Sequence, residues 1–254
     1  MTAPEAPSSR IITVASGKGG VGKTWVSATL CHLFAGQGKR VLLFDGDLGL
    51  ANVDIQLGLV PETDLGQVLS GAIALDQAIT AFPMGKGQGA FDIISGQSGT
   101  GSLASLKKER LDRLNQDLVG LSRHYDLTLM DLGAGVETSV MTLCETADKI
   151  IVVVTADPTS LTDAYAFIKL NHRRNANINL AILVNMVEDR HEGQRTYETL
   201  KKACQSFLGF TPDYLGSVRR EAHVVDAIRH QKPLMQRHPQ SHAGADMLEI
   251  AKKL

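Results

Sequence analysis

Residues 11–24 read IITVASGKGGVGKT, an apolar run that leads directly into a glycine-rich turn ending in Lys23 and Thr24. The turn has the pattern G-x-x-x-x-G-K-T and stands between a predicted strand and a predicted helix. Glycines let successive backbone N–H groups point to one centre, and the start of a helix adds partial positive charge there. The Lys23 amine suits the β- and γ-phosphates of a nucleotide, and the Thr24 hydroxyl suits Mg²⁺. Residues 17–24 therefore predict a phosphate-binding loop.

The same glycines allow a second interpretation. Gly17, Gly19 and Gly22 also spell G-x-G-x-x-G, and Asp45 ends the second predicted strand, near the ribose-binding position of a dinucleotide fold. A dinucleotide-dependent oxidoreductase is therefore an alternative. The lysine and threonine that end the loop count against it, because a dinucleotide site needs neither the extra phosphate charge nor the magnesium ligand.

Carboxylates at strand ends also favour nucleotide hydrolysis. Asp45 and Asp47 close the segment RVLLFDGD, and Asp131 closes DLTLMD. The carboxyl ends of parallel strands lie along one edge of a sheet, beside the phosphate loop. Carboxylates there can hold Mg²⁺ through its water molecules and orient a nucleophilic water. We therefore predict a magnesium-dependent site at this edge.

The rest of the chain alternates short apolar runs with longer amphipathic stretches. Unbroken apolar runs such as KIIVVVT suit strands that are covered on both faces. Predicted strands are 11–16, 40–45, 91–94, 126–131, 149–155, 179–185 and 213–217; predicted helices are 23–37, 106–123, 137–145, 159–174, 193–208, 221–230 and 243–254. This alternation predicts an α/β fold with one doubly wound, mostly parallel sheet and helices on both faces. Residues 1–10 are expected to form a disordered lead-in, and 11–254 a single domain.

Composition narrows the class of protein. The formal net charge is -1, so no overall basic field recommends nucleic acid. Cys31, Cys144 and Cys204 are far apart and form no C-x-x-C pair, which argues against zinc, an iron–sulfur cluster or a disulfide framework. The first ten residues have no apolar core, and the run at 150–154 is too short to span a bilayer. The sequence predicts a cytoplasmic protein with reduced thiols.

The loop also carries a family signature. With the additional Lys18 it reads KGGVGKT, which resembles the deviant Walker A motif of the MinD/ParA ATPases. That resemblance implies bound Mg·ATP or ADP, and a homodimer in which Lys18 reaches the partner subunit's nucleotide. It implies catalytic roles for Lys18, Lys23 and Asp47, of which Asp47 positions the attacking water. Residues expected to contact the nucleotide are Gly17, Lys18, Gly19, Gly20, Val21, Gly22, Lys23, Thr24, Trp25 and Asn185.

The resemblance extends these assignments to the metal and the base. It implies that Thr24, Asp45 and Asp131 serve the Mg²⁺ ion, with Asp131 as the Walker B acid. Asn185 is expected to read the adenine ring, which suits an amide because it both donates and accepts hydrogen bonds. Trp25 stands where many relatives carry a small polar residue, and we expect it to pack beneath the loop.

Several segments resemble the FlhG/FleN branch, whose members regulate flagellar number and placement. They are DGDLGLANVDIQLGL at 45–59, DLGAGV at 131–136, DPTSLTDAYAFIK at 157–169, LVNMV at 183–187 and VVDAIRHQKPL at 224–234. The resemblance implies slow hydrolysis that a partner stimulates. It suggests a flagellar transcription activator, a signal-recognition-type GTPase or a switch-ring protein as that partner. An alternative is a positioning ATPase for another polar cargo or a plasmid.

Two departures limit what the resemblance carries. The segment VRRE at 218–221 replaces a proline that relatives place near the adenine. The C-terminal stripe of Met247, Ile250, Ala251 and Leu254 is short, so we expect it to pack on the body and membrane binding to be weak or absent.

Short basic pairs at 173–174, 201–202 and 219–220 are expected to be surface charges, which makes DNA binding unlikely. The expected location is the cytoplasm, at a pole or at the membrane periphery.

Overall fold

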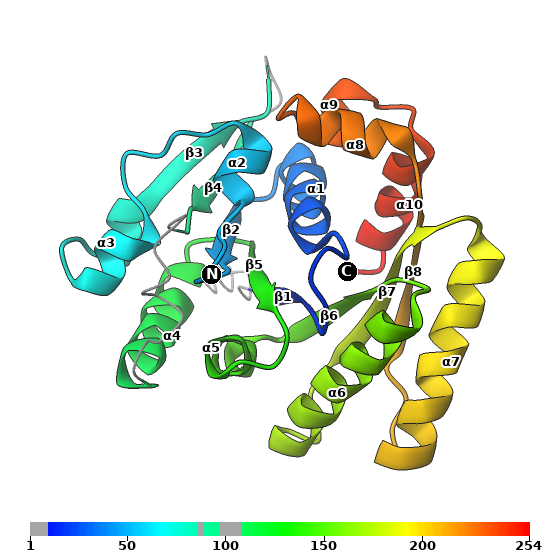
Figure 1. The fold of residues 1–254 in the computed structure, drawn as a ribbon. Coiled ribbons are helices and arrows are strands. Elements are labelled where there is room, and N and C mark those ends of the chain that lie inside the picture. Colours follow the sequence, from blue (N-terminus) through cyan, green and yellow to red (C-terminus); the bar gives the residue numbers. More distant parts are fainter. Residues whose placement is uncertain (1–9, 86–88, 97–107) are drawn as a thin grey trace, which may run out of the picture.

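One eight-stranded sheet organises the chain in the computed structural model, which describes residues 10–85, 89–96 and 108–254. The strand order is β3-β4-β2-β5-β1-β6-β7-β8 (Figure 1). The strands are β1 (Arg10–Ser16), β2 (Val41–Gly46), β3 (Ile79–Pro83), β4 (Ala90–Ile94), β5 (Leu127–Ala134), β6 (Lys149–Val154), β7 (Leu180–Val187) and β8 (Asp213–Arg219). Strand β3 pairs antiparallel with β4, and every other pair of neighbours is parallel.

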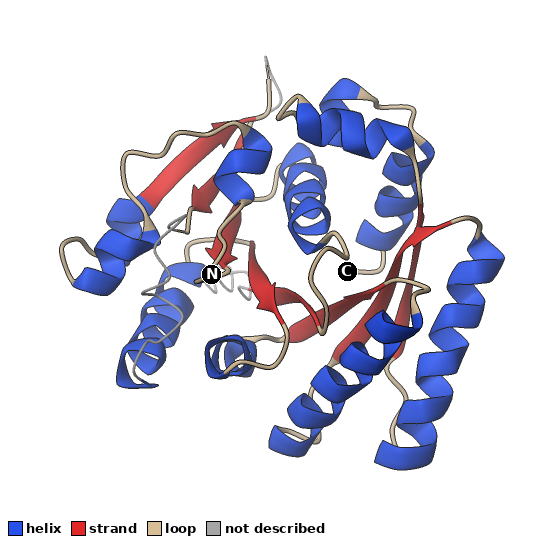
Figure 2. Cartoon of the chain, in the orientation of Figure 1, coloured by secondary structure: helices blue, strands red, loops and turns tan. Residues whose placement is uncertain are grey.

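Helices cover both faces of this sheet (Figure 2). They are α1 (Lys23–Gly36), α2 (Val53–Leu57), α3 (Leu65–Ser70), α4 (Lys108–Ser122), α5 (Thr138–Leu143), α6 (Pro158–Arg174), α7 (Arg190–Leu208), α8 (Ala222–Arg229), α9 (Leu234–Arg237) and α10 (His242–Ala251), with short 3-10 helices at Leu75–Ala78 and Cys144–Thr146. Helices α3 to α7 lie on one face. Helices α1, α2 and α8 to α10 contribute to the core on the other face.

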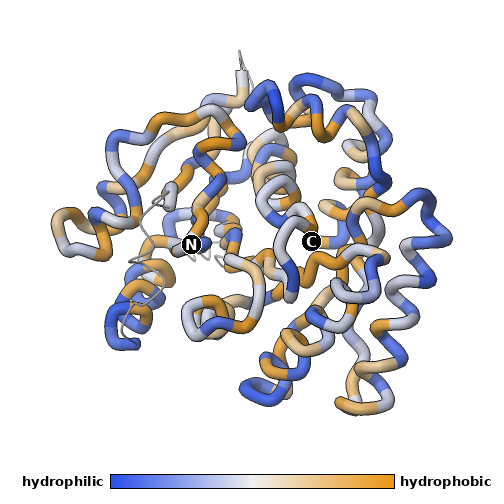
Figure 3. The backbone as a smooth tube through the Cα atoms, viewed as in Figure 1, coloured by the Kyte–Doolittle hydropathy of each residue, from blue (hydrophilic) through white to orange (hydrophobic). Residues whose placement is uncertain are grey.

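The core forms two layers because successive strand residues point to opposite faces. In β6, Ile150, Val152 and Val154 join the cluster under α4 to α7, whereas Ile151 and Val153 join the cluster under α1 and α10. The orange stretches in Figure 3 follow these central strands. The predicted doubly wound sheet with helices on both faces is therefore confirmed.

Element boundaries differ from the predicted ones mostly by one to three residues. Each of the predicted strands is present, and the structure adds the edge strand β3 and the short helices α2, α3 and α9. Arg10 is already part of β1 and pairs with Leu127 of β5, so β1 begins inside the predicted lead-in. Residues 1–9, and residues 106–107 of the helix predicted at 106–123, lie outside the described residues.

Helix α10 places the C-terminal apolar stripe inside the molecule. Met247, Ile250 and Ala251 are 0%, 2% and 4% exposed and pack in the same cluster as α1. The stripe therefore packs on the body, as the sequence predicts. Among the described residues, no helix is both long enough and apolar enough to cross a lipid bilayer.

Candidate nucleotide-binding site

The glycine-rich loop leaves β1 in the middle of the sheet and enters α1. Its backbone takes left-handed conformations at Gly20 (φ 76°) and Gly22 (φ 93°), which residues with a side chain rarely adopt. Gly22 is also the N-cap of α1 and offers no capping side chain. The first amides of α1 are therefore turned toward the loop and remain available to an anion.

Gly17 has a role that its motif does not reveal. A Cβ atom at this position would lie 2.2 Å from the carbonyl carbon of Asp163 in α6. The loop therefore packs directly on the backbone of α6, and only glycine fits there. By contrast, a Cβ atom on Gly19 would meet nothing within 4 Å.

Lys23 and Asp131 form the buried centre of the site. The Lys23 side chain is 9% exposed, and burial lowers its pKa against the raising effect of Asp131 and Asp47. Asp131 is 2% exposed and accepts hydrogen bonds from Thr24 and from Ser27, the latter at 3.1 Å. Burial raises the pKa of the Asp131 carboxyl to about 6, although these hydrogen bonds and the Lys23 charge oppose the shift.

Asp45 is fully buried and organises the segment that follows β2. Its Oδ1 accepts from the Asp47 amide at 3.2 Å, and its Oδ2 accepts from the Asn52 and Val53 amides at 3.1 Å each. The two hydrogen bonds to Oδ2 satisfy backbone amides at the start of α2 that have no partner within the helix. Burial, and then the nearby Asp131 charge, raise the pKa of Asp45 to about 8.

Asp47 lies beside the end of β5. Its Oδ1 accepts from the Leu50 amide at 2.9 Å, and a Cβ atom on Gly133 would lie 3.3 Å from the same oxygen. The structure therefore brings Asp45, Asp47 and Asp131 together next to Lys23, as the sequence predicts from their positions at strand ends.

These residues fit a magnesium ion that arrives with a nucleotide. Within the described ranges, no three His, Cys, Asp or Glu side chains gather to hold a metal ion by themselves. Mg²⁺ usually takes one or two protein ligands and completes its shell with water and phosphate oxygens. The hydrogen-bonded pair of Thr24 and Asp131 matches that requirement.

Lys18 points away from the buried centre. Its Nζ atom lies 3.0 Å from Oδ2 of Asp157 and also donates to the Thr159 hydroxyl. Thr159, and then Lys18, lower the pKa of the Asp157 carboxyl to about 2. In the single chain, Lys18 is thus held at the start of α6 rather than over its own loop.

Asn185 and Trp25 both support the loop. Asn185 is 4% exposed; its Nδ2 donates to the Val21 carbonyl at 2.8 Å and its Oδ1 accepts from the Met186 amide at 2.9 Å. Trp25 is 5% exposed and packs in the core, in agreement with the expectation that it packs beneath the loop. Contacts of Asn185 and Trp25 with a nucleotide stay predictions.

A cavity of about 480 Å³ lies next to the loop. It is lined by residues 18–21 of the loop, by residues 155–157 after β6, by Met186, Glu188 and Arg220 at or just after the ends of β7 and β8, and by Glu192 in the first turn of α7. Its position at the carboxyl edge of the sheet is where open α/β sheets bind ligands. A larger cavity of about 1010 Å³ between α3 and α4 contains none of these residues.

Comparison with known proteins decides the family. A family model described as the CobQ/CobB/MinD/ParA nucleotide binding domain matches residues 12–234. The chain belongs to this family. It is 35% identical to the antiactivator FleN of Pseudomonas aeruginosa over 245 residues, which cover 96% of this chain and 86% of FleN. It is 33% identical to the flagellum site-determining protein YlxH of Helicobacter pylori, over 89% of this chain and 74% of YlxH.

Solved structures show the same CobQ/CobB/MinD/ParA fold. The septum site-determining protein MinD of Pyrococcus horikoshii, solved with Mg-ADP, superposes with a TM-score of 0.78 at 23% identity, over 96% of this chain and 95% of that one. MinD of Aquifex aeolicus gives a TM-score of 0.75 at 25% identity, over 96% and 95% of the two chains. The predicted MinD/ParA membership is confirmed, and FleN and YlxH agree with the predicted flagellar branch. The family assignment favours the phosphate-loop interpretation over the dinucleotide alternative.

Proposed function

We propose that this chain is a Mg·ATP-dependent ATPase that dimerises around its nucleotide and acts as a switch in the control of flagellar number or placement. The observation that carries the proposal is the convergence of Lys23, Asp47 and Asp131 on one glycine-rich loop, with Lys18 held at the outside of that loop. The family match supports nucleotide binding at this loop.

Each residue takes a role that its position supports. Lys23 and the loop amides hold the β- and γ-phosphates, and Thr24, Asp45 and Asp131 serve the Mg²⁺ ion directly or through water. Asp47 orients the attacking water. The bound ion supplies positive charge for phosphoryl transfer. No strong general base is required, because positioning and electrostatics dominate this reaction.

The exposed position of Lys18 supports the proposed dimer. Its side chain is 37% exposed, so the amine can exchange Asp157 for phosphate oxygens on a second copy. ATP would then join two subunits face to face, and hydrolysis would separate them. The rate is expected to be slow until a partner stimulates it.

The names of the relatives support a flagellar role. FleN is an antiactivator and YlxH a flagellum site-determining protein. A transcription activator, a signal-recognition-type GTPase or a switch-ring protein therefore remains the proposed partner. The second candidate is positioning of another polar cargo or a plasmid, since plasmid partition proteins share the fold with TM-scores of 0.63 and 0.70. Identification of a co-purified partner separates the two.

Surface charges and α10 bear on the remaining partners. Each predicted basic pair has one member bound to a carboxylate: Arg174 to Glu145, Lys201 to Glu198 and Arg219 to Asp246. Because these carboxylates neutralise one positive charge of each pair, we propose that the chain has little affinity for DNA. The buried α10 stripe supports weak or no membrane binding by this helix. The proposed location is the cytoplasm, at a pole or peripherally at the membrane.

Solution mass in excess Mg·ATP, compared with Mg·ADP, tests the proposal. We expect ATP to dimerise the wild type, Asp47→Ala to hold the dimer by blocking hydrolysis, and Lys18→Ala to abolish it. Lys202→Ala, which removes an exposed lysine from α7, is the matched control and should behave like the wild type. Monomers throughout, with ATP demonstrably bound, would reject the dimer.

Nucleotide choice is tested by thermal unfolding, because a ligand that binds the folded state raises the melting temperature. Mg·ATP should raise it and NADH should not. The opposite result would restore the dinucleotide enzyme.

A further inference from the structure

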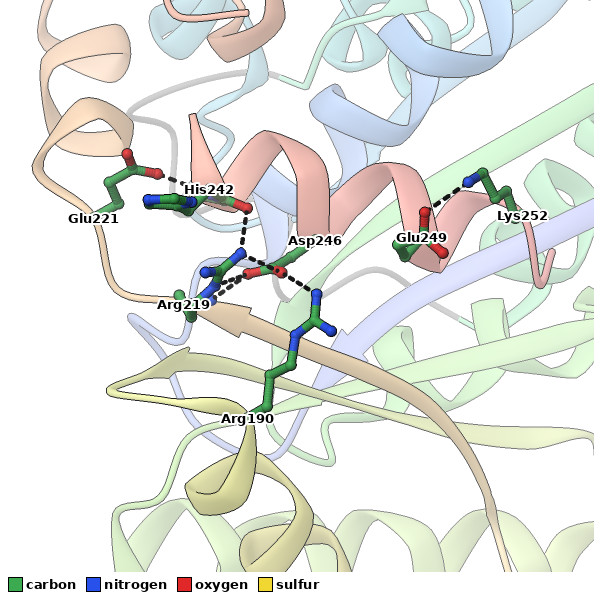
Figure 4. Close-up of polar contacts among 8 residues, drawn as sticks. Arg190, Arg219, Glu221, His242, Asp246, Glu249 and Lys252 are labelled. Carbon is green, nitrogen blue, oxygen red and sulfur yellow. Dashed lines mark hydrogen bonds and ion pairs between the residues drawn. The ribbon is translucent and has the colours of Figure 1, made fainter. Parts of the chain in front are cut away.

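The C-terminal helix α10 is tied to the end of β8 through Asp246 (Figure 4). Arg219, the last residue of β8, donates to this carboxylate three times: Nε to Oδ2 at 2.8 Å, Nη2 to Oδ1 at 2.9 Å, and its backbone amide to Oδ2 at 3.1 Å. Arg190, at the start of α7, brings a second guanidinium to 3.5 Å from Oδ1. One carboxylate therefore fixes the backbone and the side chain of Arg219 together.

Asp246 is buried while its partners are not. Its side chain is 2% exposed, against 28% for Arg219 and 73% for Arg190. A buried charge is tolerated only when it is paired and hydrogen-bonded, so this carboxylate holds Arg219 firmly. Glu221 adds a second tie between the same segments, because its Oε2 accepts from the Ala243 amide at 2.8 Å.

The end of β8 continues the contact toward the candidate site. Arg219 stands opposite Val187 in β7, and the Arg220 amide donates to the Val187 carbonyl at 2.7 Å. Two residues before Val187, Asn185 donates to the loop carbonyl of Val21. Arg220 itself lines the 480 Å³ cavity. Three polar contacts, linked by two short backbone segments in β7 and after β8, thus join α10 to the loop.

We propose that Asp246 is a positioning residue for the base end of the nucleotide site, which it controls by fixing Arg219 and the turn after β8 against β7. The inference rests on the proposed function, since it requires an adenine nucleotide with its base near Asn185 and Arg220.

The residues proposed to hold the phosphates have further supports of their own. Gly17 packs on the backbone of α6, and Thr24 is hydrogen-bonded to Asp131 in the second half of β5. Neither contact involves β8 or α10. Loss of the Asp246 carboxylate should therefore weaken recognition of the base and leave phosphate binding unchanged.

Two control variants separate this role from simple structural support. Asp126 accepts the same three hydrogen bonds from Arg40: the Arg40 backbone amide and Nη2 donate at 2.8 Å each, and Arg40 Nε donates at 3.5 Å. Asp126 lies just before β5, at the end of that strand away from the loop. Asp126→Asn thus removes a carboxylate of the same pattern elsewhere. Met247→Ala loosens α10 by removing packing, without touching Arg219.

The experiment measures the Kd of Mg·ATP and of Mg·tripolyphosphate, which lacks the base, by displacement of a ribose-labelled fluorescent ATP from the full chain. For Asp246→Asn we expect the Kd of ATP to rise about tenfold, the effect of one charge-assisted hydrogen bond. The Kd of tripolyphosphate should stay at its wild-type value. Asp126→Asn and Met247→Ala should change neither the Kd of ATP nor the Kd of tripolyphosphate.

Two results would overturn the inference. One is an Asp246→Asn protein that binds ATP as tightly as the wild type, and the other is an equal loss for both ligands. If Asp246→Asn does not fold, Arg219→Lys replaces it: the fork is lost while the charge and backbone amide remain, and a smaller selective loss for ATP is required. Failure of the wild type to bind ATP at all would instead reject the proposed function.

Discussion

Lys18 Nζ lies 3.0 Å from Oδ2 of Asp157 in its own chain, so the residue assigned to the proposed dimer contact is already engaged in the single subunit. The two side chains are 37% and 48% exposed, and such pairs contribute little to stability. Lys18 can therefore leave Asp157 at small cost, but that cost opposes dimerisation.

Asp157→Asn should favour the ATP dimer. The neutral amide no longer attracts the Lys18 amine, so we expect dimer affinity to rise about two- to fivefold, the range of an exposed ion pair. Analytical ultracentrifugation with Mg·ATP measures this. Glu145→Gln, which breaks the comparable exposed pair with Arg174, is the control. Weaker dimerisation of Asp157→Asn would mean that Asp157 contributes to the dimer instead.

Gly17→Ala and Gly19→Ala should differ sharply in stability. The new methyl group at position 17 would collide with the α6 backbone, whereas at position 19 it meets nothing within 4 Å. Overpacking against backbone costs about 1–3 kcal/mol. Urea unfolding of the nucleotide-free proteins should show that loss for Gly17→Ala, with little change for Gly19→Ala. Equal stabilities would show that the loop can move away from α6.

Two carboxyl groups of the site should make the free energy of unfolding fall as pH rises. Folding raises the pKa of Asp45 from 3.8 to about 8 and that of Asp131 from 3.8 to about 6. The folded protein therefore keeps protons that the unfolded chain releases, so this contribution is full below pH 3.8 and is lost as pH rises through 6 and 8.

Urea unfolding without Mg²⁺ or nucleotide, repeated across that pH range, measures the effect as a slope. Asp45→Asn and Asp131→Asn should each flatten it, whatever they do to absolute stability. Slopes equal to that of the wild type would show that neither carboxyl is protonated in the folded protein.

Met247→Ala should destabilise the protein strongly, because the Met247 side chain of α10 is fully buried in the core cluster that also holds α1. Removing a buried methionine side chain costs about 2–5 kcal/mol. Its neighbour Leu248 is 37% exposed, so Leu248→Ala should cost much less. Thermal or urea unfolding measures both. A similar small effect of the two changes would place the apolar stripe of α10 at the surface.

Most of the fold could be predicted because its strands are apolar and covered on both faces. Runs such as those of β6 and β7 carry that signal within the run itself. Strand β3 could not be predicted, since it is a five-residue edge strand with a single buried position and a final proline. Helices α2 and α3 have five and six residues, too few for a helical period to appear in the sequence.

The candidate site was likewise predictable in part. The loop, Lys23 and the three carboxylates lie together as their strand-end positions predict. The contact of Gly17 with α6, the capping of α2 by Asp45 and the pairing of Arg219 with Asp246 were not predicted. Each depends on which elements meet in space, and nothing local in the sequence encodes it.

Strand β1 divides the site into two halves. On one side, β2 and β5 carry Asp45 and Asp131; on the other, β6, β7 and β8 lead to Asp157, Asn185 and Arg220. Substitutions at positions without shared partners usually have additive effects. Substitutions on the β6–β8 side, which faces the proposed base end of the nucleotide, should therefore leave the carboxylates on the β2–β5 side undisturbed. Such an architecture would let the choice of base change while the proposed hydrolytic chemistry stays constant.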